Sequence, residues 1–163
     1  AGGANNDTQE YNGTDWSEGN NLNTGRYAIG CSGTQTAALA AGGSPPGNTG
    51  SNLSEEYNGT NWTEGNNLGT GRYKLTIFGT QTAAVAAGGD TGPANVNNVE
   101  HYDGTSWTNA TVYPSTLTFA ASAGSQTDVL VFFGDFGPGT GATIYTYDAV
   151  FYTHQTMPTT LFV

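Results

Sequence analysis

Positive charge is almost missing from this sequence of 163 residues. Lys and Arg together number 3, against 13 Asp and Glu, so the formal net charge is −10. Nucleic-acid binding needs a basic footprint for phosphates, and an anionic membrane surface also attracts basic segments. We therefore expect no nucleic-acid partner and no attachment to an anionic membrane surface.

Cysteine, long apolar runs and helix-forming residues are also scarce, and each scarcity limits the possible fold classes. The single cysteine, Cys31, excludes an intramolecular disulfide. No apolar run reaches the roughly 18 residues of a transmembrane helix, so we expect no membrane insertion. Helix-forming Glu, Lys, Leu and Met are scarce, whereas β-branched and aromatic residues alternate with turn residues. With 3 Trp, 9 Tyr and 7 Phe available for a core, the composition predicts one all-β domain.

One largely apolar sequence segment occurs three times along the chain. It is GTQTAALAAGG at 33–43, GTQTAAVAAGG at 79–89 and, in altered form, GSQTDVLVFFGD at 124–135. Self-similarity at a period of 20–50 residues is typical of units that bury their faces against neighbouring copies. The sequence therefore predicts a repeat architecture with a period of about 45 residues.

A tyrosine followed by a second aromatic residue keeps the same period. The tyrosines are Tyr11, Tyr57, Tyr102 and Tyr147, and five residues after each stands Trp16, Trp62, Trp107 or Tyr152. Asn-Gly or Asp-Gly separates the first three pairs, and Asp148-Ala149 the fourth. These Gly dipeptides favour type I′ hairpin turns, whose two central residues need positive φ. Each copy thus predicts a strand, a tight turn and a strand, with a less ideal turn in the fourth.

The remainder of each unit predicts a second hairpin. The expected first strands are 27–31 and 73–78, the turns are Gly33-Thr34 and Gly79-Thr80, and the second strands are 35–41 and 81–87. The second strands are mostly apolar, as expected for strands covered on both faces. Their alanines indicate close approach of neighbouring sheets. Each unit is predicted to be a four-stranded antiparallel meander.

This arrangement resembles the kelch repeat of β-propellers. The matching signs are a double glycine closing the second strand, a Tyr ending the third, a Trp opening the fourth, and Arg26 or Arg72 ten residues after that Trp. Leu117 stands in the third arginine position, and the fourth copy lacks the double glycine and the Trp. The Lys-poor, Asn/Thr/Gly-rich sequence of the repeats is also similar to kelch-like repeats in fibre and appendage proteins of bacteriophages.

The resemblance implies an all-β fold, a β-propeller built from four-stranded antiparallel kelch-like blades. The expected parts are a partial blade at 1–18, blades at 26–64, 72–109 and 117–154, and the start of another strand at 161–163. Closed propellers typically carry 4–8 blades. Because the chain begins without Met and starts and stops within a repeat, we expect further copies outside it. A ring of four blades closed by the two chain ends, and an open or intermolecular stack, are the alternatives.

An up-down-up-down unit places its loops on two faces. The short NGT and GTQT turns share one face, and the long loops 44–52, 90–98 and 136–141 share the other with the links between blades. Function usually lies on long loops carried by a rigid scaffold. The candidate ligand-binding residues on this long-loop face are Asn20, Asn21, Arg26, Tyr27, Asn66, Asn67, Arg72 and Tyr73.

Two roles are open for these candidates. Amide, guanidinium and hydroxyl groups beside aromatic surface suit a cell-surface glycan. Alternatively, Asn and Gly serve the turns, and each Arg bonds a carboxylate such as Glu18 or Glu64. The Trp residues are expected to pack between blades, because a sugar-stacking role would require exposure. Cys31 is expected to be a buried, inert thiol.

The sequence carries no recognisable catalytic constellation. His101 and His154 lie in different units without a third ligand at metal spacing, and there is no G-x-S-x-G motif. Glu55-Glu56 is the only adjacent acidic pair, and strand alternation sends these side chains to opposite faces. We therefore expect no enzyme, no cofactor and no metal site.

The expected function is that of a non-enzymatic structural or receptor-binding module in an extracellular assembly, on a phage fibre at the virion surface or on a related appendage. Its expected partners are other copies of itself or of the assembly, and a cell-surface glycan. The alternative is part of a secreted bacterial propeller enzyme, a hydrolase or oxidase, whose site lies in further repeats. An intracellular adaptor that grips a peptide is disfavoured, because no basic or apolar groove signature is present.

Overall fold

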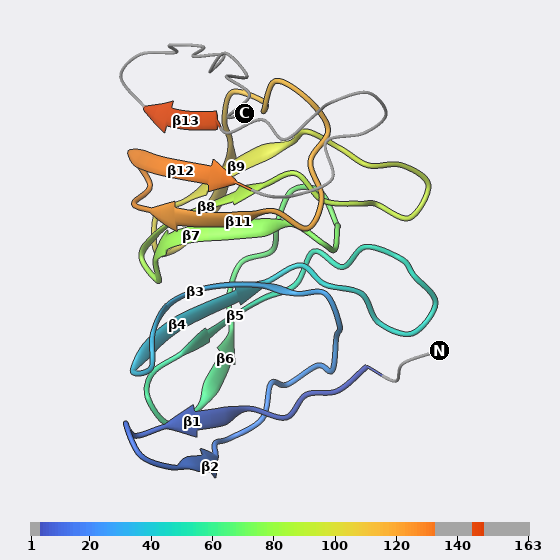
Figure 1. The fold of residues 1–163 in the computed structure, drawn as a ribbon. Helices are drawn as coiled ribbons and strands as arrows, with labels where there is room; N and C mark the ends of the chain where they lie inside the picture. Colours follow the sequence, from blue (N-terminus) through green and yellow to red (C-terminus); the bar gives the residue numbers. More distant parts are fainter. Residues whose placement is uncertain (1–3, 133–144, 149–163) are drawn as a thin grey trace, which may run out of the picture.

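The computed structural model of the chain describes residues 4–132 and 145–148. These residues form four antiparallel sheets and contain no helix (Figure 1), which confirms the all-β prediction. The sheets follow one another in chain order and lie side by side. The predicted loop 136–141, the strand start at 161–163 and the last strand of 117–154 lie outside the described residues.

Each full repeat forms one four-stranded meander. The first sheet contains β1 (Gln9–Tyr11) and β2 (Trp16–Glu18). The second contains β3 (Gly30–Thr34), β4 (Ala37–Ala41), β5 (Ser54–Tyr57) and β6 (Trp62–Glu64), in that order. The third contains β7 (Thr76–Thr80), β8 (Ala83–Ala87), β9 (Val99–Tyr102) and β10 (Trp107–Asn109). The fourth contains β11 (Ala121–Gly124), β12 (Asp128–Phe132) and β13 (Tyr145–Asp148).

The first hairpin of each unit is shifted from its predicted place. Thr34 pairs with Ala37, so the turn is at Gln35-Thr36, and the prediction of a turn at Gly33-Thr34 was wrong. The strand also starts at Gly30 instead of Tyr27, because Ala28 takes a left-handed φ of 50° that interrupts the ladder. Tyr27 keeps only an isolated bridge to Ser44. The third sheet repeats this geometry in β7 and β8.

The Asn-Gly hairpin is built differently from the predicted type I′ turn. Tyr57 pairs with Trp62, so four residues form the loop, and only Gly59 has positive φ. Asn58 stabilises the loop through its side-chain oxygen, which accepts hydrogen bonds from the backbone amides of Thr60 and Asn61 at 3.0 and 2.9 Å. Asn12 and Asp103 do the same in their copies. The side-chain amide or carboxylate thus stabilises the loop by hydrogen bonds, and a second residue with positive φ is not needed.

Both kinds of short turn lie on one edge of the sheets, as predicted. A Cβ on Gly59 would lie 3.4 Å from Thr36 Cα, and one on Gly104 3.2 Å from Thr82 Cβ. The long loops leave the opposite edge (Figure 1). This separation fixes which side chains gather on the long-loop face.

Two apolar cores fill the spaces between neighbouring sheets. The core between the second and third sheets contains Leu39, Ala41, Leu68, Leu75, Ile77, Ala84, Ala86 and Tyr102. The core between the third and fourth contains Phe78, Val85, Ala87, Val99, Tyr113, Leu117, Val129 and Val131. A Cβ on Gly30 would come within 2.6 Å of Ile77 Cγ1. The predicted close approach of neighbouring sheets is therefore confirmed.

Candidate functional site

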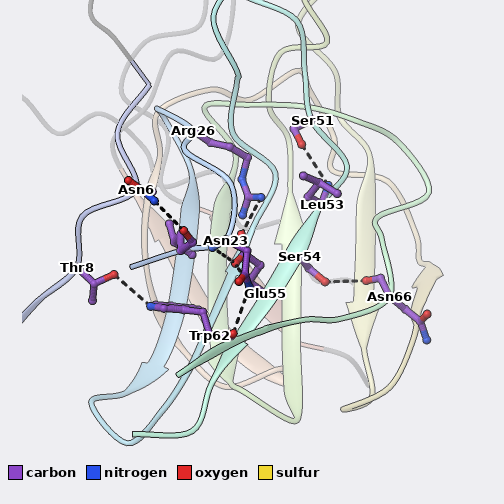
Figure 2. Close-up of polar contacts among 11 residues, drawn as sticks. Asn6, Thr8, Asn23, Arg26, Ser51, Leu53, Ser54, Glu55, Trp62 and Asn66 are labelled. Carbon is purple, nitrogen blue, oxygen red and sulfur yellow. Dashed lines mark hydrogen bonds and ion pairs between the residues drawn. The ribbon is translucent and has the colours of Figure 1, made fainter. Parts of the chain in front are cut away.

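Two of the candidate ligand-binding residues are buried arginines that hold the links between sheets. Arg26 is 4% exposed and its Nη1 lies 3.0 Å from Glu55 Oε1 (Figure 2). Arg72 is fully buried and its Nη1 lies 2.5 Å from Glu100 Oε1. Burial lowers the pKa of the Arg72 guanidinium, and Glu100 opposes that shift. A carboxylate partner was predicted correctly, but it is a third-strand glutamate of the next sheet, not Glu18 or Glu64.

The second oxygen of each buried glutamate is also occupied. Glu55 Oε2 accepts the Asn23 backbone amide at 2.7 Å and the Asn23 side-chain amide at 2.9 Å (Figure 2). Glu100 Oε2 accepts the Gly69 amide at 2.6 Å. A buried charge is tolerated when its partner and its remaining lone pairs are satisfied. These carboxylates therefore fasten the incoming link to its own sheet.

The candidate asparagines do not converge on one place. Asn20 and Asn66 donate to the carbonyls of Thr60 and Thr105 at 2.8 and 2.7 Å, in the short turns of the following sheets. Asn21 donates to Asp7 Oδ1 at 3.4 Å, and Asn67 is exposed. Asn66 also lines an open polar hollow with Glu56 and Glu64. Asn20 and Asn66 thus lie toward the short-turn side rather than on the long-loop face.

The two candidate tyrosines, in contrast, meet on the long-loop face. The rings of Tyr27 and Tyr73 lie edge to face with centroids 6.3 Å apart. The Tyr27 hydroxyl donates to Asn48 Oδ1 in the long loop. Tyr73 is buried and bridges to Asp90, so it anchors the next long loop. This is the one part of the predicted residue set that the fold brings together.

Beside these rings three consecutive sheets share one unusual backbone feature. Ala28, Lys74 and Phe119 occupy the same place in their copies, and all have left-handed φ, at 50°, 58° and 55°. The Lys74 amide donates to Ala28 O and the Phe119 amide to Lys74 O, each at 2.9 Å. Non-glycine residues persist in this region only when their surroundings hold them there, and such strain gathers at functional sites.

Aromatic and charged side chains gather around this left-handed ladder, the row of Ala28, Lys74 and Phe119 joined by backbone hydrogen bonds. Lys74 Nζ lies 4.6 Å from the Tyr73 ring centroid, 5.3 Å from that of Phe119 and 2.9 Å from Asp90 Oδ2. The Phe119 ring is 64% exposed. We call Tyr27, Tyr73, Lys74, Asp90 and Phe119 the Lys74 cluster. An exposed ring beside a fixed ion pair is typical of sites that combine apolar contact with a few oriented polar groups.

The ion pair of the Lys74 cluster is stable at neutral pH. Partial burial opposes ionisation of Asp90, but hydrogen bonds from Lys74 and from the Gly92 amide outweigh it and lower the pKa of this carboxyl. The hydrogen bond to Asp90 in turn raises the pKa of Lys74. Both groups are therefore charged across the physiological range.

The tryptophans show how neighbouring sheets lock together. Trp62 Nε1 donates to Thr8 Oγ1 at 3.1 Å (Figure 2), and Trp107 Nε1 to Ser54 Oγ at 3.4 Å, each in the preceding sheet. The packing role is therefore confirmed for these two. Trp16 is 68% exposed and contacts Tyr11 at a centroid distance of 5.1 Å. No described sheet precedes the one that carries Trp16.

The expectation that Cys31 is a buried thiol was wrong. Its side chain is exposed. Its equivalent one repeat later, Ile77, is 7% exposed and lies against Gly30 of the preceding sheet. Among the described residues the first sheet supplies only β1 and β2.

The adjacent glutamates Glu55 and Glu56 serve different partners. Glu55 bonds Arg26, whereas Glu56 accepts the Tyr102 hydroxyl at 2.5 Å, so the adjacent carboxylates point to opposite faces as predicted. No group of three His, Cys, Asp or Glu side chains with metal-binding proximity occurs in this part of the chain, and His154 lies outside it. None of the described segments is a helix of the length and hydropathy needed to cross a membrane.

Comparison with known proteins adds no family. The sequence matches no protein-family model, and a search of curated proteins gives no match. The kelch resemblance and the functional reading therefore depend on the residues and geometry described above.

Proposed function

We propose that this chain is a non-enzymatic, kelch-like β-propeller module of an extracellular assembly, a structural and receptor-binding part of a phage fibre or related surface appendage. We further propose that it binds a cell-surface glycan through the Lys74 cluster on its long-loop face. Similar modules of the same or other copies are its structural partners. The low positive charge and the repeated, tightly fastened sheets support a rigid exterior role.

The observation that carries the proposal is the exposed Phe119 ring held beside the Lys74–Asp90 ion pair. An exposed aromatic face packs against the C–H face of a sugar. A lysine and a carboxylate at fixed positions then donate to and accept from adjacent hydroxyls. The left-handed ladder keeps these groups in place before a ligand arrives, which reduces the entropic cost of binding.

The rest of the predicted residue set supports the scaffold part of the proposal. Arg26 and Arg72 form buried ion pairs with Glu55 and Glu100. Asn20 and Asn66 bridge successive sheets through main-chain carbonyls. These residues set the positions of the links and loops without facing a ligand themselves.

Glycan binding is tested on an array of surface oligosaccharides. We expect the 163-residue chain to bind at least one glycan class and Phe119→Ser to weaken that binding by about tenfold, which corresponds to roughly 1.4 kcal/mol of lost stacking and apolar contact. Lys74→Met should weaken it as well, because the ion pair is lost from the cluster.

Trp16→Ser is the matched control, since it removes another exposed aromatic ring far from the long-loop face. Equal losses in the Phe119 and Trp16 variants, or no glycan signal from the parent chain, would contradict the site. Turnover of a bound glycan that depends on residues of this chain would overturn the non-enzymatic assignment.

A further inference from the structure

The Asn58-Gly59 turn places a side-chain amide next to a backbone nitrogen that is able to attack it. Asn58 is exposed, and Gly59 has a φ of 88° in the loop between β5 and β6. The Cγ of an asparagine is an electrophile, and addition of the next residue's amide nitrogen to it closes a succinimide ring. Glycine in that next position leaves the approach sterically open, because it has no Cβ.

The hydrogen bonds of this turn activate the Asn58 side chain for that addition. The backbone amides of Thr60 and Asn61 donate to the same oxygen, Asn58 Oδ1, at 3.0 and 2.9 Å. Addition at Cγ moves negative charge onto Oδ1, so the two amides act as a small oxyanion hole. The Gly59 amide, which is the nucleophile, is not used in these bonds or in the backbone bond from Asn58 to Asn61.

The third sheet shows that the fold accepts an aspartate in the same turn. Asp103 takes the place of Asn58, and its Oδ1 accepts the amides of Thr105 and Ser106 at 2.9 and 2.8 Å. Gly104 has a φ of 90°, close to that of its equivalent in the second sheet. Hydrogen bonds from the Ser106 and Thr105 amides lower the pKa of Asp103. A carboxylate in this turn is therefore stabilised by the same two donors, through charge-assisted bonds.

We propose that Asn58 is a self-modification site, at which the folded turn promotes conversion of the asparagine to aspartate, with water as the only co-reactant and ammonia as the leaving group. The Asn12-Gly13 turn has the same bonds to Oδ1, each at 2.9 Å, and reacts in the same way. Each conversion adds a negative charge to the short-turn face. The modification is independent of the glycan proposed for the long-loop face.

The reaction proceeds through the succinimide. The Gly59 nitrogen forms a bond to Asn58 Cγ, the Cγ–Nδ2 bond breaks, and Nδ2 leaves as ammonia with the proton of the Gly59 nitrogen. Water then opens the ring. Attack of water at Cγ restores the backbone and yields aspartate, whereas attack at the main-chain carbonyl carbon yields isoaspartate, with an additional carbon in the backbone. The aspartate product keeps the loop length that the Tyr57–Trp62 pair closes.

The test follows Asn58 in the full 163-residue chain during storage at mildly alkaline pH, by peptide mapping and mass spectrometry. Asn109 is the internal control, because it is also exposed, but the Ala110 amide that follows it donates to Val99 O at 2.9 Å. We expect Asn58 to convert about 100-fold faster than Asn109, since even one oxyanion donor contributes about that factor in enzymes. An Asn58 that reacts no faster than Asn109 would overturn the proposal.

Unfolding the same chain in guanidinium chloride separates the contribution of the turn from that of the Asn-Gly sequence. The unfolded chain keeps the sequence but loses the two amides that are positioned on Oδ1. Asn58 should therefore convert more slowly in the unfolded chain than in the folded one. Equal or faster conversion in the unfolded chain would show that the folded turn does not promote the reaction, and the proposal would fail.

Asp103→Asn is the matched variant, because it gives the third sheet an Asn-Gly turn with the same pair of amide donors. We expect this asparagine to convert at about the rate of Asn58, which returns the variant to the parent sequence. Circular dichroism checks that the variant is folded before storage. A folded variant whose new asparagine stays unconverted while Asn58 reacts would contradict the role assigned to the turn.

Discussion

Replacing Arg72 with leucine is expected to lower the free energy of unfolding by about 3–5 kcal/mol, the usual cost of removing one partner from a buried ion pair. Both side chains of the pair are at most 1% exposed, and Nη1 lies 2.5 Å from Glu100 Oε1. The variant leaves the Glu100 carboxylate inside the third sheet with only the Gly69 amide as a hydrogen-bond partner in the described structure. Urea unfolding followed by circular dichroism measures the loss.

In the fourth copy of the repeat, both residues of this ion pair are replaced by uncharged residues. Leu117 replaces the arginine in the fourth copy, where it is 1% exposed. Tyr145 lies opposite Val131 as Glu100 lies opposite Ala86, so it replaces the glutamate. Both members of the pair are therefore absent from the same copy. Physical chemistry demands this, because either charge alone would be buried without a partner.

The double variant Arg72→Leu with Glu100→Tyr should accordingly recover most of the stability that Arg72→Leu loses. Arg26→Leu with Glu55→Tyr repeats the experiment in the second sheet, where the same pair is buried. If the double variants were no more stable than the single arginine variants, the two residues would not act as a coupled pair, and this reading of the repeat would fail.

Gly88→Ala is expected to destabilise the chain by about 2–5 kcal/mol, which combines roughly 1–2 for a left-handed alanine with about 1–3 for overpacking. Gly88 has a φ of 65°, and a Cβ there would overlap the Leu117 carbonyl oxygen and lie 2.8 Å from Leu117 Cβ. Leu117 leads into the next sheet, so the added methyl group pushes the third and fourth sheets apart. Thermal and urea unfolding of the variant measure the effect.

Gly13→Ala is the control for backbone strain alone. Gly13 has a φ of 98°, and an added Cβ would meet nothing within 4 Å. Its cost should stay near the roughly 1–2 kcal/mol of the left-handed conformation. Equal losses at the two glycines would mean that contact between sheets contributes nothing to the requirement for glycine at the end of the second strand.

The repeat made most of the sheet architecture predictable, but not the contacts between residues far apart in the sequence. Gly33-Thr34 resembles a turn by composition, yet the turn falls at Gln35-Thr36. In the next copy the equivalent glutamine reaches back to two carbonyls of the preceding sheet. The partner of Arg72 was sought near its own link, whereas Glu100 lies 28 residues further on. Both misses concern contacts between residues far apart in the sequence, which local propensity does not report.

Of the Lys74 cluster, the sequence predicted the two tyrosines but not Lys74 or Phe119. Tyr27 and Tyr73 stood out as aromatic residues beside the links, and they do meet. Lys74 and Phe119 carried no such signal, because neither lysine nor phenylalanine favours left-handed φ. Their backbone conformation is imposed by the hydrogen bonds that join Ala28, Lys74 and Phe119 across three sheets. The shared position in the repeat was the one available clue.

The packing of successive repeats as side-by-side sheets is tested most directly by an engineered disulfide. Thr76 and Ser122 lie 46 residues apart in β7 and β11, and their hydroxyl oxygens are 2.8 Å apart. In a Cys31→Ser background, Thr76→Cys with Ser122→Cys should form one intramolecular disulfide on mild oxidation of the folded monomer, since this separation is close enough for a bridge. Two thiols that stay free in the folded, oxidised chain would contradict the packing on which the proposed function depends.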